Sequence, residues 1–189
     1  MIPNFLLIID NSENLYETAE LPFCLDFAVD NMLDCMRTII PEPLVAFATF
    51  DLQFADFTPV SQVSAKSYAL DKLDKSDKSH ELGESGELGE SDKSHEPNKS
   101  QKAAQNANFA ELPSIINPQI LDNKNVVNIL LSTGNFPTLR ARFEGPTYAI
   151  AIGKNALFGQ LAYFAKNRER VFKPHDAHFL PLFALAKNY

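Results

Sequence analysis

The stretch at residues 5–14, Phe-Leu-Leu-Ile-Ile-Asp-Asn-Ser-Glu-Asn, changes from apolar to polar at Asp10. The five apolar residues before Asp10 are too few for a helix of their own, and two of them are β-branched. They predict a strand that is buried on both faces of a parallel sheet. The polar residues then follow at the carboxyl edge of that sheet, where open α/β folds bind their ligands. This stretch therefore predicts both a fold class and the position of a functional site.

Asp10, Ser12 and Asn14 occupy alternate positions of the turn after this strand. Their carboxylate, hydroxyl and amide oxygens are ligands that a hard cation such as Mg²⁺ prefers. The same residue types are also common in strand-to-helix turns and at helix N-caps, which leaves a purely structural role as the alternative. The turn is thus a candidate Mg²⁺ site or a hydrogen-bonded turn.

Strand and helix patterns alternate along most of the remaining sequence. Apolar residues, Phe23 and Phe27 among them, recur at mostly three- and four-residue spacing and predict an amphipathic helix at 22–39. Further strands are expected at 44–50, 53–58, 126–131, 147–152 and 170–172, and further helices within 110–123 and at 155–166 and 177–186. Asp176 is the expected N-cap of the last helix. The order predicts an α/β fold with a doubly wound, mostly parallel six-stranded sheet, one antiparallel edge strand and helices on both faces.

A low-complexity insert is expected at residues 71–107, within a single domain that spans residues 1–189. The segment Ser-Asp-Lys-Ser-His-Glu occurs at 76–81 and again at 91–96, and the insert contains no aromatic residue. Such a composition buries too little apolar surface to offset the entropy of ordering, so disorder is predicted. His80 and His95 have no nearby Cys or third His, which argues against a metal site in the insert.

Composition narrows the range of functions. The net charge of −7 argues against a nucleic-acid partner, and no apolar run is long enough to predict a membrane partner. The first residues lack the basic start of a secretory signal, so we expect a cytoplasmic protein. Cys24 and Cys35 are expected to be core thiols, unpaired in a reducing compartment. No glycine-rich phosphate loop and no pairing of a nucleophile with a base is recognisable.

Four motifs together resemble a von Willebrand factor A (vWA) domain. Residues 10–14 are similar to the Asp-x-Ser-x-Ser motif of that family, and Phe50-Asp51 matches the aromatic-Asp end of its second strand. Leu-Leu-Ser-Thr-Gly at 130–134 stands where the family has a hydrophobic-Thr-Asp-Gly turn, and residues 148–183 follow its last strands and helices. Among such domains, the chain looks most like the compact bacterial cytoplasmic kind that is associated with tellurium-resistance and stress gene clusters.

The resemblance implies a non-enzymatic module that binds another protein. In such domains an acidic side chain of the partner completes the coordination of a metal held at the metal-ion-dependent adhesion site (MIDAS). Carried over to this chain, the ligands are Asp10, Ser12, Asn14 and Thr133, with Mg²⁺ as the metal. The family's threonine ligand has no assignable counterpart, and Ser114 and Thr58 are candidates only by their place in the sequence.

Two departures from the family pattern predict a degenerate site. Asn14 replaces a serine, although its amide oxygen is still a possible ligand, and Thr133 replaces an aspartate, which removes a negative charge. Because Mg²⁺ gives up its hydration water reluctantly, a site with one carboxylate is expected to bind it weakly or to remain a hydrogen-bonded turn.

Two alternatives stay open at this point. One is a Mg²⁺-dependent phosphohydrolase or phosphotransfer domain with Asp10 as the nucleophile, although the nearest second carboxylate is Glu13. The other is a metal-free scaffold in which Asp10 only caps the turn.

Overall fold

The computed structural model describes residues 2–12, 15, 18, 20–51, 53–63, 113–136 and 143–188. The expected insert at 71–107, with His80 and His95, lies outside the described residues, and so does Asn14. The division of the chain into one domain with an insert therefore stays a prediction.

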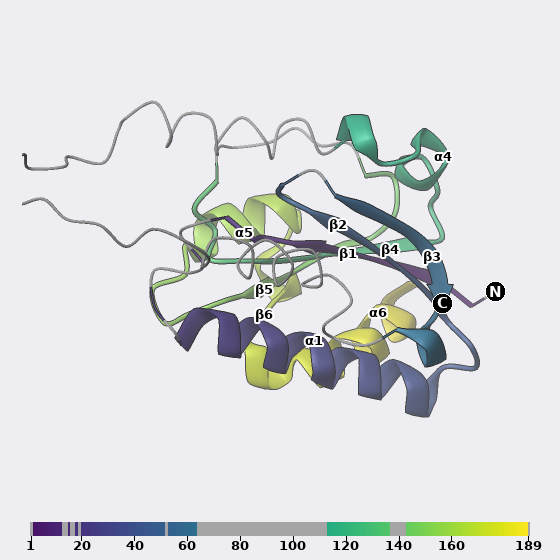
Figure 1. The fold of residues 1–189 in the computed structure, drawn as a ribbon, viewed down its shortest axis with the longest axis horizontal. Coiled ribbons are helices and arrows are strands. Elements are labelled where there is room, and N and C mark those ends of the chain that lie inside the picture. Colours follow the sequence, from purple (N-terminus) through teal and green to yellow (C-terminus); the bar gives the residue numbers. More distant parts are fainter. Residues whose placement is uncertain are drawn as a thin grey trace, which may run out of the picture.

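Six strands form one sheet in the order β3-β2-β1-β4-β5-β6. They are β1 (Asn4–Ile9), β2 (Leu44–Thr49), β3 (Phe54–Pro59), β4 (Val126–Ser132), β5 (Thr147–Ala151) and β6 (Val171–Phe172). Every neighbouring pair is parallel except β2 and β3, which pair antiparallel at one edge. The predicted fold class is confirmed. Because β2 lies on one side of β1 and β4 on the other, the topological switch point falls between β1 and β4 (Figure 1).

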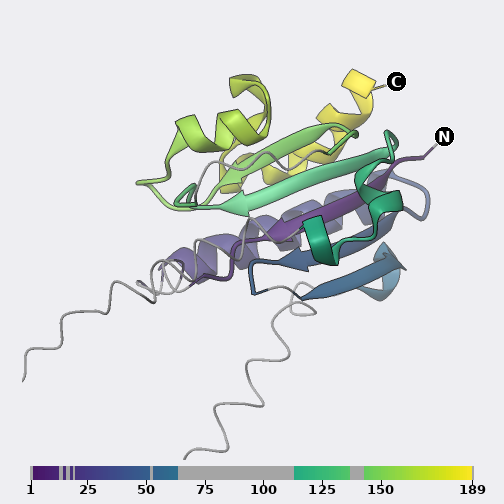
Figure 2. The same cartoon turned by 90° about the horizontal axis from the view of Figure 1, so that it is seen from above.

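Helices cover both faces of the sheet. The described part of the chain contains α1 (Glu20–Ile39), α4 (Pro118–Leu121), α5 (Phe158–Phe164) and α6 (Leu180–Asn188), with 3₁₀ segments η2 (Val60–Gln62), η4 (Arg168–Arg170) and η5 (Pro174–Phe179). Residues of α1, η5 and α6 pack on one face, and residues of α4 and α5 pack on the other. Figures 1 and 2 show these layers, with the sheet between them.

The central strand β1 is buried on both faces, as its apolar run predicts. Phe5, Leu7 and Ile9 join the core under α1, whereas Leu6 and Ile8 join the core under α4 and α5. All five side chains have no solvent exposure. A strand with two buried faces has no polar side to show, which is why its sequence reads as a continuous apolar run.

Helix α1 differs from its prediction at its N-terminal end. Its buried side chains begin at Leu25 and continue through Met36 at helical spacing. Phe23 and Phe27 point away from the core and are 71% and 45% exposed. Cys24 and Cys35 are free thiols, and both are partly exposed, so neither lies fully inside the core as expected, although Cys24 packs against its margin. None of the described helices combines the length and apolar character that crossing a bilayer requires.

The C-terminal third also departs from prediction. The helix expected at 155–166 is shorter, since α5 covers only Phe158–Phe164. The last helix begins as the 3₁₀ segment η5, in which Lys173 is the N-cap and Pro174 occupies the first turn, and it continues as α6 from Leu180. Asp176 therefore lies inside η5 and is not an N-cap. Because proline is favoured in the first turn of a helix, the helical backbone starts at Pro174, two residues before the expected N-cap Asp176.

Candidate functional site

Asp10 follows β1 and is fully buried at the carboxyl edge of the sheet. Its Oδ1 accepts hydrogen bonds from the backbone N–H of Ser12 at 3.1 Å and from the Ser12 hydroxyl at 2.5 Å. Its Oδ2 accepts one from the Ser132 hydroxyl at 2.6 Å, and the backbone N–H of Thr133 also donates to the carboxylate. Two carboxylate oxygens offer about four lone-pair positions, so these four donors leave the carboxylate satisfied by the protein.

Ser132 connects this network to the neighbouring strand across the switch point. The register pairs Ile9 with Leu131, so Asp10 and Ser132 are the next residues on adjacent strands. The Ser132 hydroxyl also accepts the backbone N–H of Gly134 at 2.9 Å. Gly134 has φ +82°, and a Cβ there would lie 2.8 Å from the carbonyl oxygen of Leu157. Glycine therefore allows the tight turn that brings the loop after β4 against the start of α5.

Burial dominates the electrostatics of Asp10. Removal from solvent raises the pKa of its carboxyl above the ordinary value of 3.8, whereas the hydrogen bonds from Ser12, Ser132 and the backbone of Thr133 act to lower it. A carboxylate with no solvent exposure and four internal donors is poorly placed to attack a substrate. This arrangement argues against Asp10 as the nucleophile of a phosphotransfer enzyme.

A second set of hydrogen bonds joins the loops after β1 and β2. The backbone N–H of Asp51 donates to Oδ1 of Asn11 at 3.1 Å, and the backbone N–H of Phe50 donates to the carbonyl of Ile9 at 3.1 Å. The Thr49 hydroxyl donates to the Asp51 carboxylate. Asp51, which the sequence analysis noted in the Phe50-Asp51 match to the family pattern, therefore puts an exposed carboxylate at the same edge as Asp10.

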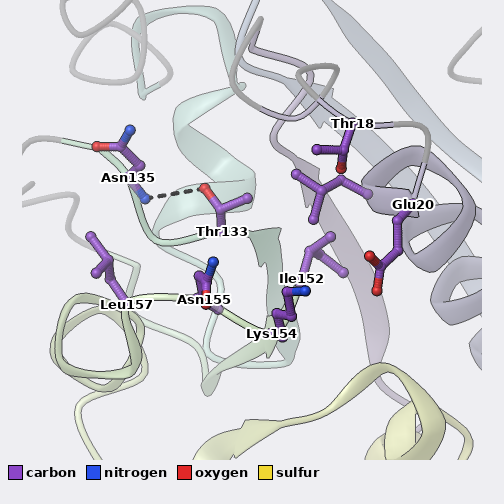
Figure 3. Close-up of a pocket in the computed structure, with 11 residues that line it drawn as sticks. Thr18, Glu20, Thr133, Asn135, Ile152, Lys154, Asn155 and Leu157 are labelled. Carbon is purple, nitrogen blue, oxygen red and sulfur yellow. Dashed lines mark hydrogen bonds between the residues drawn. The ribbon is translucent and has the colours of Figure 1, made fainter.

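A cavity of about 470 Å³ opens beside the Asp10 network (Figure 3). Its walls come from Thr18 and the start of α1, from the loop after β4, and from residues 152–157 after β5. Thr133 belongs to both features, because its backbone N–H donates to Asp10 and its side chain lines the cavity. The Thr133 hydroxyl accepts the backbone N–H of Asn135 at 3.4 Å, the dashed line in Figure 3. The site thus combines a closed hydrogen-bond network with an open cavity that is lined by both polar and apolar groups.

The structure brings together only part of the predicted ligand set. Ser12 contacts Asp10 directly, Thr133 contacts it through its backbone, and Asn14 is outside the described residues. The residue that the sequence analysis missed is Ser132. Its signal was available, since Asp10 and Ser132 are each the first polar residue after the apolar end of a strand.

The donor chemistry fits a hard cation in type but supplies little charge. Hydroxyl and carboxylate oxygens of Asp10, Ser12 and Ser132 lie within one hydrogen-bonded cluster. Among the residues that the structure describes, no three Asp, Glu, His or Cys side chains form a group that could hold a metal. A cation would therefore compete with the hydroxyl protons that now occupy Asp10, and binding at this cluster would be weak.

Comparison with known proteins supports the fold. No model of a known protein family matches the sequence, and no curated protein matches it either. Proximal thread matrix protein 1 (PTMP1) from the mussel byssus matches 98% of this chain with 17% identity and a TM-score of 0.50. The form of PTMP1 with a zinc-occupied MIDAS motif matches 96% with 12% identity and the same TM-score. The pilus adhesin SpaC from Lactobacillus rhamnosus GG, in its open conformation, matches 100% with 9% identity and a TM-score of 0.51.

These similarities extend to part of each neighbour. The chain covers 45% and 47% of the two PTMP1 chains and 30% of SpaC. At such low identities the match concerns backbone architecture alone. Together with the sheet order and the single antiparallel edge, the comparisons show that the chain has a vWA-like fold.

Proposed function

We propose that this chain is a non-enzymatic protein-binding module that presents the carboxyl-edge loops of its vWA-like fold to a partner protein. The observation that carries the proposal is the Asp10–Ser132 hydrogen bond across the switch point, beside a cavity that is open to solvent and lined by both polar and apolar groups. The bond fixes the ends of β1 and β4, so the loops around the cavity form a preorganised surface. Preorganisation lowers the entropic cost of binding a partner.

The proposal includes a weakly held divalent cation, Mg²⁺ in the first place. Its ligands would be Asp10, Ser12, Asn14 and Thr133, and the cation would supply a positive charge that attracts an acidic side chain of the partner. Two points support this part: the oxygen chemistry of the loop, and the zinc-occupied MIDAS motif of a mussel protein with a similar fold.

A metal-free scaffold is the second candidate, and a specific observation favours it. All four lone-pair positions of Asp10 are taken by protein donors, so the fold satisfies the carboxylate without a cation. In that form the same loops bind the partner through hydrogen bonds and side-chain contacts alone.

Titration with Mn²⁺ and Mg²⁺ separates the two forms. Isothermal titration and thermal unfolding would be measured on the full chain, on Asp10→Asn and on Asp51→Asn, which removes an exposed carboxylate from the same edge. A site at Asp10 predicts saturable binding that Asp10→Asn abolishes and Asp51→Asn keeps. Metal at a hundredfold excess over its Kd would raise the free energy of unfolding by about 2.7 kcal/mol. No binding at millimolar metal would exclude the cation and leave the metal-free form.

The motif resemblance extends the proposal to a cytoplasmic protein of a bacterial stress or tellurium-resistance system. A deletion strain challenged with tellurite and complemented with the wild-type chain tests that assignment. Full tolerance of the deletion strain would count against it.

A further inference from the structure

A second cavity, of about 560 Å³, shares Glu20, Gly153 and Lys154 with the first cavity and has a largely apolar lining. We call it the α1–α5 groove. It is lined by Glu20, Cys24 and Phe27 of α1, by Ala151, Gly153, Lys154 and Phe158 at the end of β5 and the start of α5, and by Lys173, Pro174 and His175 before and within η5. Its size is in the range of pockets that accept one or two side chains.

The short edge strand β6 explains why the groove exists. Its two residues pair with Ala149 and Ile150 of β5, and Ala151 has no partner on β6. Ala151 and Gly153 therefore form part of the groove lining where a longer strand would have covered them. Pro174 lies two residues after the end of β6 and has no backbone N–H with which to extend the ladder.

Aromatic side chains are exposed at this groove. Phe27 and Phe158 both line it and are 45% and 36% exposed. Phe23 lies one turn before Phe27 on the same helix and is the most exposed large apolar side chain in the described part of the chain. Neighbouring exposed aromatic residues of this kind are typical of protein-binding surfaces.

Charge at the groove selects the kind of partner. Lys154 and Lys173 line it, and neither forms a salt bridge among the described residues, where the ion pairs are Arg37–Asp34 and His175–Asp176. Glu20 is the carboxylate in the lining, and Figure 3 shows it on α1 across from Lys154. In a chain with a net charge of −7, two lysines without an internal partner favour an acidic ligand.

We propose that the α1–α5 groove binds a segment of a partner protein that carries a Leu- or Phe-sized side chain flanked by carboxylates. The apolar side chain packs between Phe27 and Phe158, and the carboxylates pair with Lys154 and Lys173. The inference rests on the proposed function in that the ligand is a protein. It does not require a cation at Asp10.

Peptide display against the full-length chain tests the groove with a defined probe. We expect random twelve-residue peptides to converge on an apolar residue flanked by Asp or Glu. The affinity of the selected peptide, measured by fluorescence anisotropy, should fall about tenfold or more in Phe27→Gln and about fivefold in Lys173→Glu. Raising the salt concentration should weaken binding to the wild-type chain and have less effect on Lys173→Glu.

Matched controls separate the groove from general surface effects. Phe179→Gln removes an exposed aromatic residue outside the groove, and Lys124→Glu reverses a charge in the turn before β4, at the opposite edge of the sheet. Both variants should bind the selected peptide as the wild-type chain does. Circular dichroism of Phe27→Gln checks that the fold is retained. Because the Lys173 side chain is exposed, Lys173→Glu provides a second variant that leaves the core intact.

Several outcomes would overturn the inference. These are a selection that yields no peptide, peptides without acidic residues, and binding that Phe27→Gln and Lys173→Glu leave unchanged. A dimer in sedimentation velocity that Phe27→Gln dissociates would make a second copy the occupant. The sequence Glu-Leu-Gly-Glu occurs at 81–84 and at 87–90, and tighter peptide binding after Leu82→Ser and Leu88→Ser would make these segments the occupant. Peptide binding that is lost in Thr133→Ala but kept in Phe27→Gln would support the proposed function and reject the groove.

Discussion

Replacing Ser132 with alanine tests the hydrogen-bond network at the switch point. The substitution removes the donor to Oδ2 of Asp10 and the acceptor of the Gly134 N–H, and both groups are buried. A hydrogen bond to a charged group contributes about 1.5–3 kcal/mol, and an unpaired buried N–H costs about 1–3 kcal/mol more. Because alanine is only one atom smaller than serine, the cavity term is small. We expect Ser132→Ala to lower the free energy of unfolding by about 3 kcal/mol, a large part of the stability of an ordinary domain.

Urea unfolding at pH 7, followed by circular dichroism, measures this loss. Ser12→Ala is the matched control, since it also removes one hydroxyl donor to Asp10. Ser12 is partly exposed and its backbone N–H still donates to the carboxylate, so its loss should be about 1 kcal/mol. The double variant Asp10→Asn/Ser132→Ala should show a coupling energy of about 1 kcal/mol or more between the two residues.

Equal losses in Ser132→Ala and Ser12→Ala would refute this reasoning. Such a result would mean that water reaches Asp10 in the folded protein and replaces the Ser132 hydroxyl without loss. Additive effects in the double variant would likewise show that Asp10 and Ser132 stabilise the fold independently.

Three further predictions concern single buried groups. Burial raises the pKa of Asp10 in the folded protein above 3.8, so its ionised form destabilises the fold. The measurement compares the unfolding free energy of the wild-type chain with that of Asp10→Asn, in EDTA, as the pH is lowered from 7 through the folded pKa towards 3.8. The wild-type value minus the variant value should increase over this range, and a decrease in that difference would contradict the prediction. Thr147→Val should raise the unfolding free energy by about 1 kcal/mol, because the Thr147 hydroxyl is buried without a partner beside Asn128, and a decrease would indicate a bound water instead. Gly145→Ala should lower the unfolding midpoint in urea by an amount equivalent to about 2 kcal/mol or more, because its Cβ would lie 1.9 Å from the carbonyl oxygen of Val126, and an unchanged midpoint would show that the backbone moves freely there.

The parallel strands were predictable because burial on both faces produces a recognisable run of apolar residues in the sequence. A strand covered on both faces has a mostly apolar sequence, as β1, β4 and β5 do, although the buried Asn128 interrupts the run of β4. The observed bounds of β4 and β5 lie within one residue of those expected. The place of Asp10 was predictable for the same reason, since the first polar residue after such a run must stand at the edge of the sheet.

The sequence marked Ser132 as the first polar residue after β4, but its pairing with Asp10 depends on the register of two strands whose residues are 122 positions apart. The family pattern drew attention to Thr133, and a one-residue shift along a strand turns a side chain to the other face. Ser132 faces the Asp10 carboxylate, whereas the Thr133 side chain lines the neighbouring cavity. Only the three-dimensional register decides between these two hydroxyl residues.

Helix α1 shows a related limit. Phe23 and Phe27 share one face of α1 with each other, but that face lies opposite the buried side chains, which begin at Leu25. A list of apolar residues at mostly three- and four-residue spacing can therefore include residues of two different faces. The same apolar pattern therefore contains both a core and an exposed surface, which is the surface of the α1–α5 groove.

Thr133 has no carboxylate, whereas the family motif that the sequence resembles has an aspartate at that place, and the Asp10 network accommodates a single buried carboxylate. In a metal site, charge on the ligands and charge on the cation compensate one another, so removing a carboxylate weakens the site. Here four protein donors compensate the Asp10 carboxylate, and its hydrogen bond to Ser132 holds β1 and β4 together at the switch point. Under the proposed function, recognition of a partner would then depend on side chains that have no ion pair among the described residues, such as Lys154 and Lys173 beside the exposed Phe27.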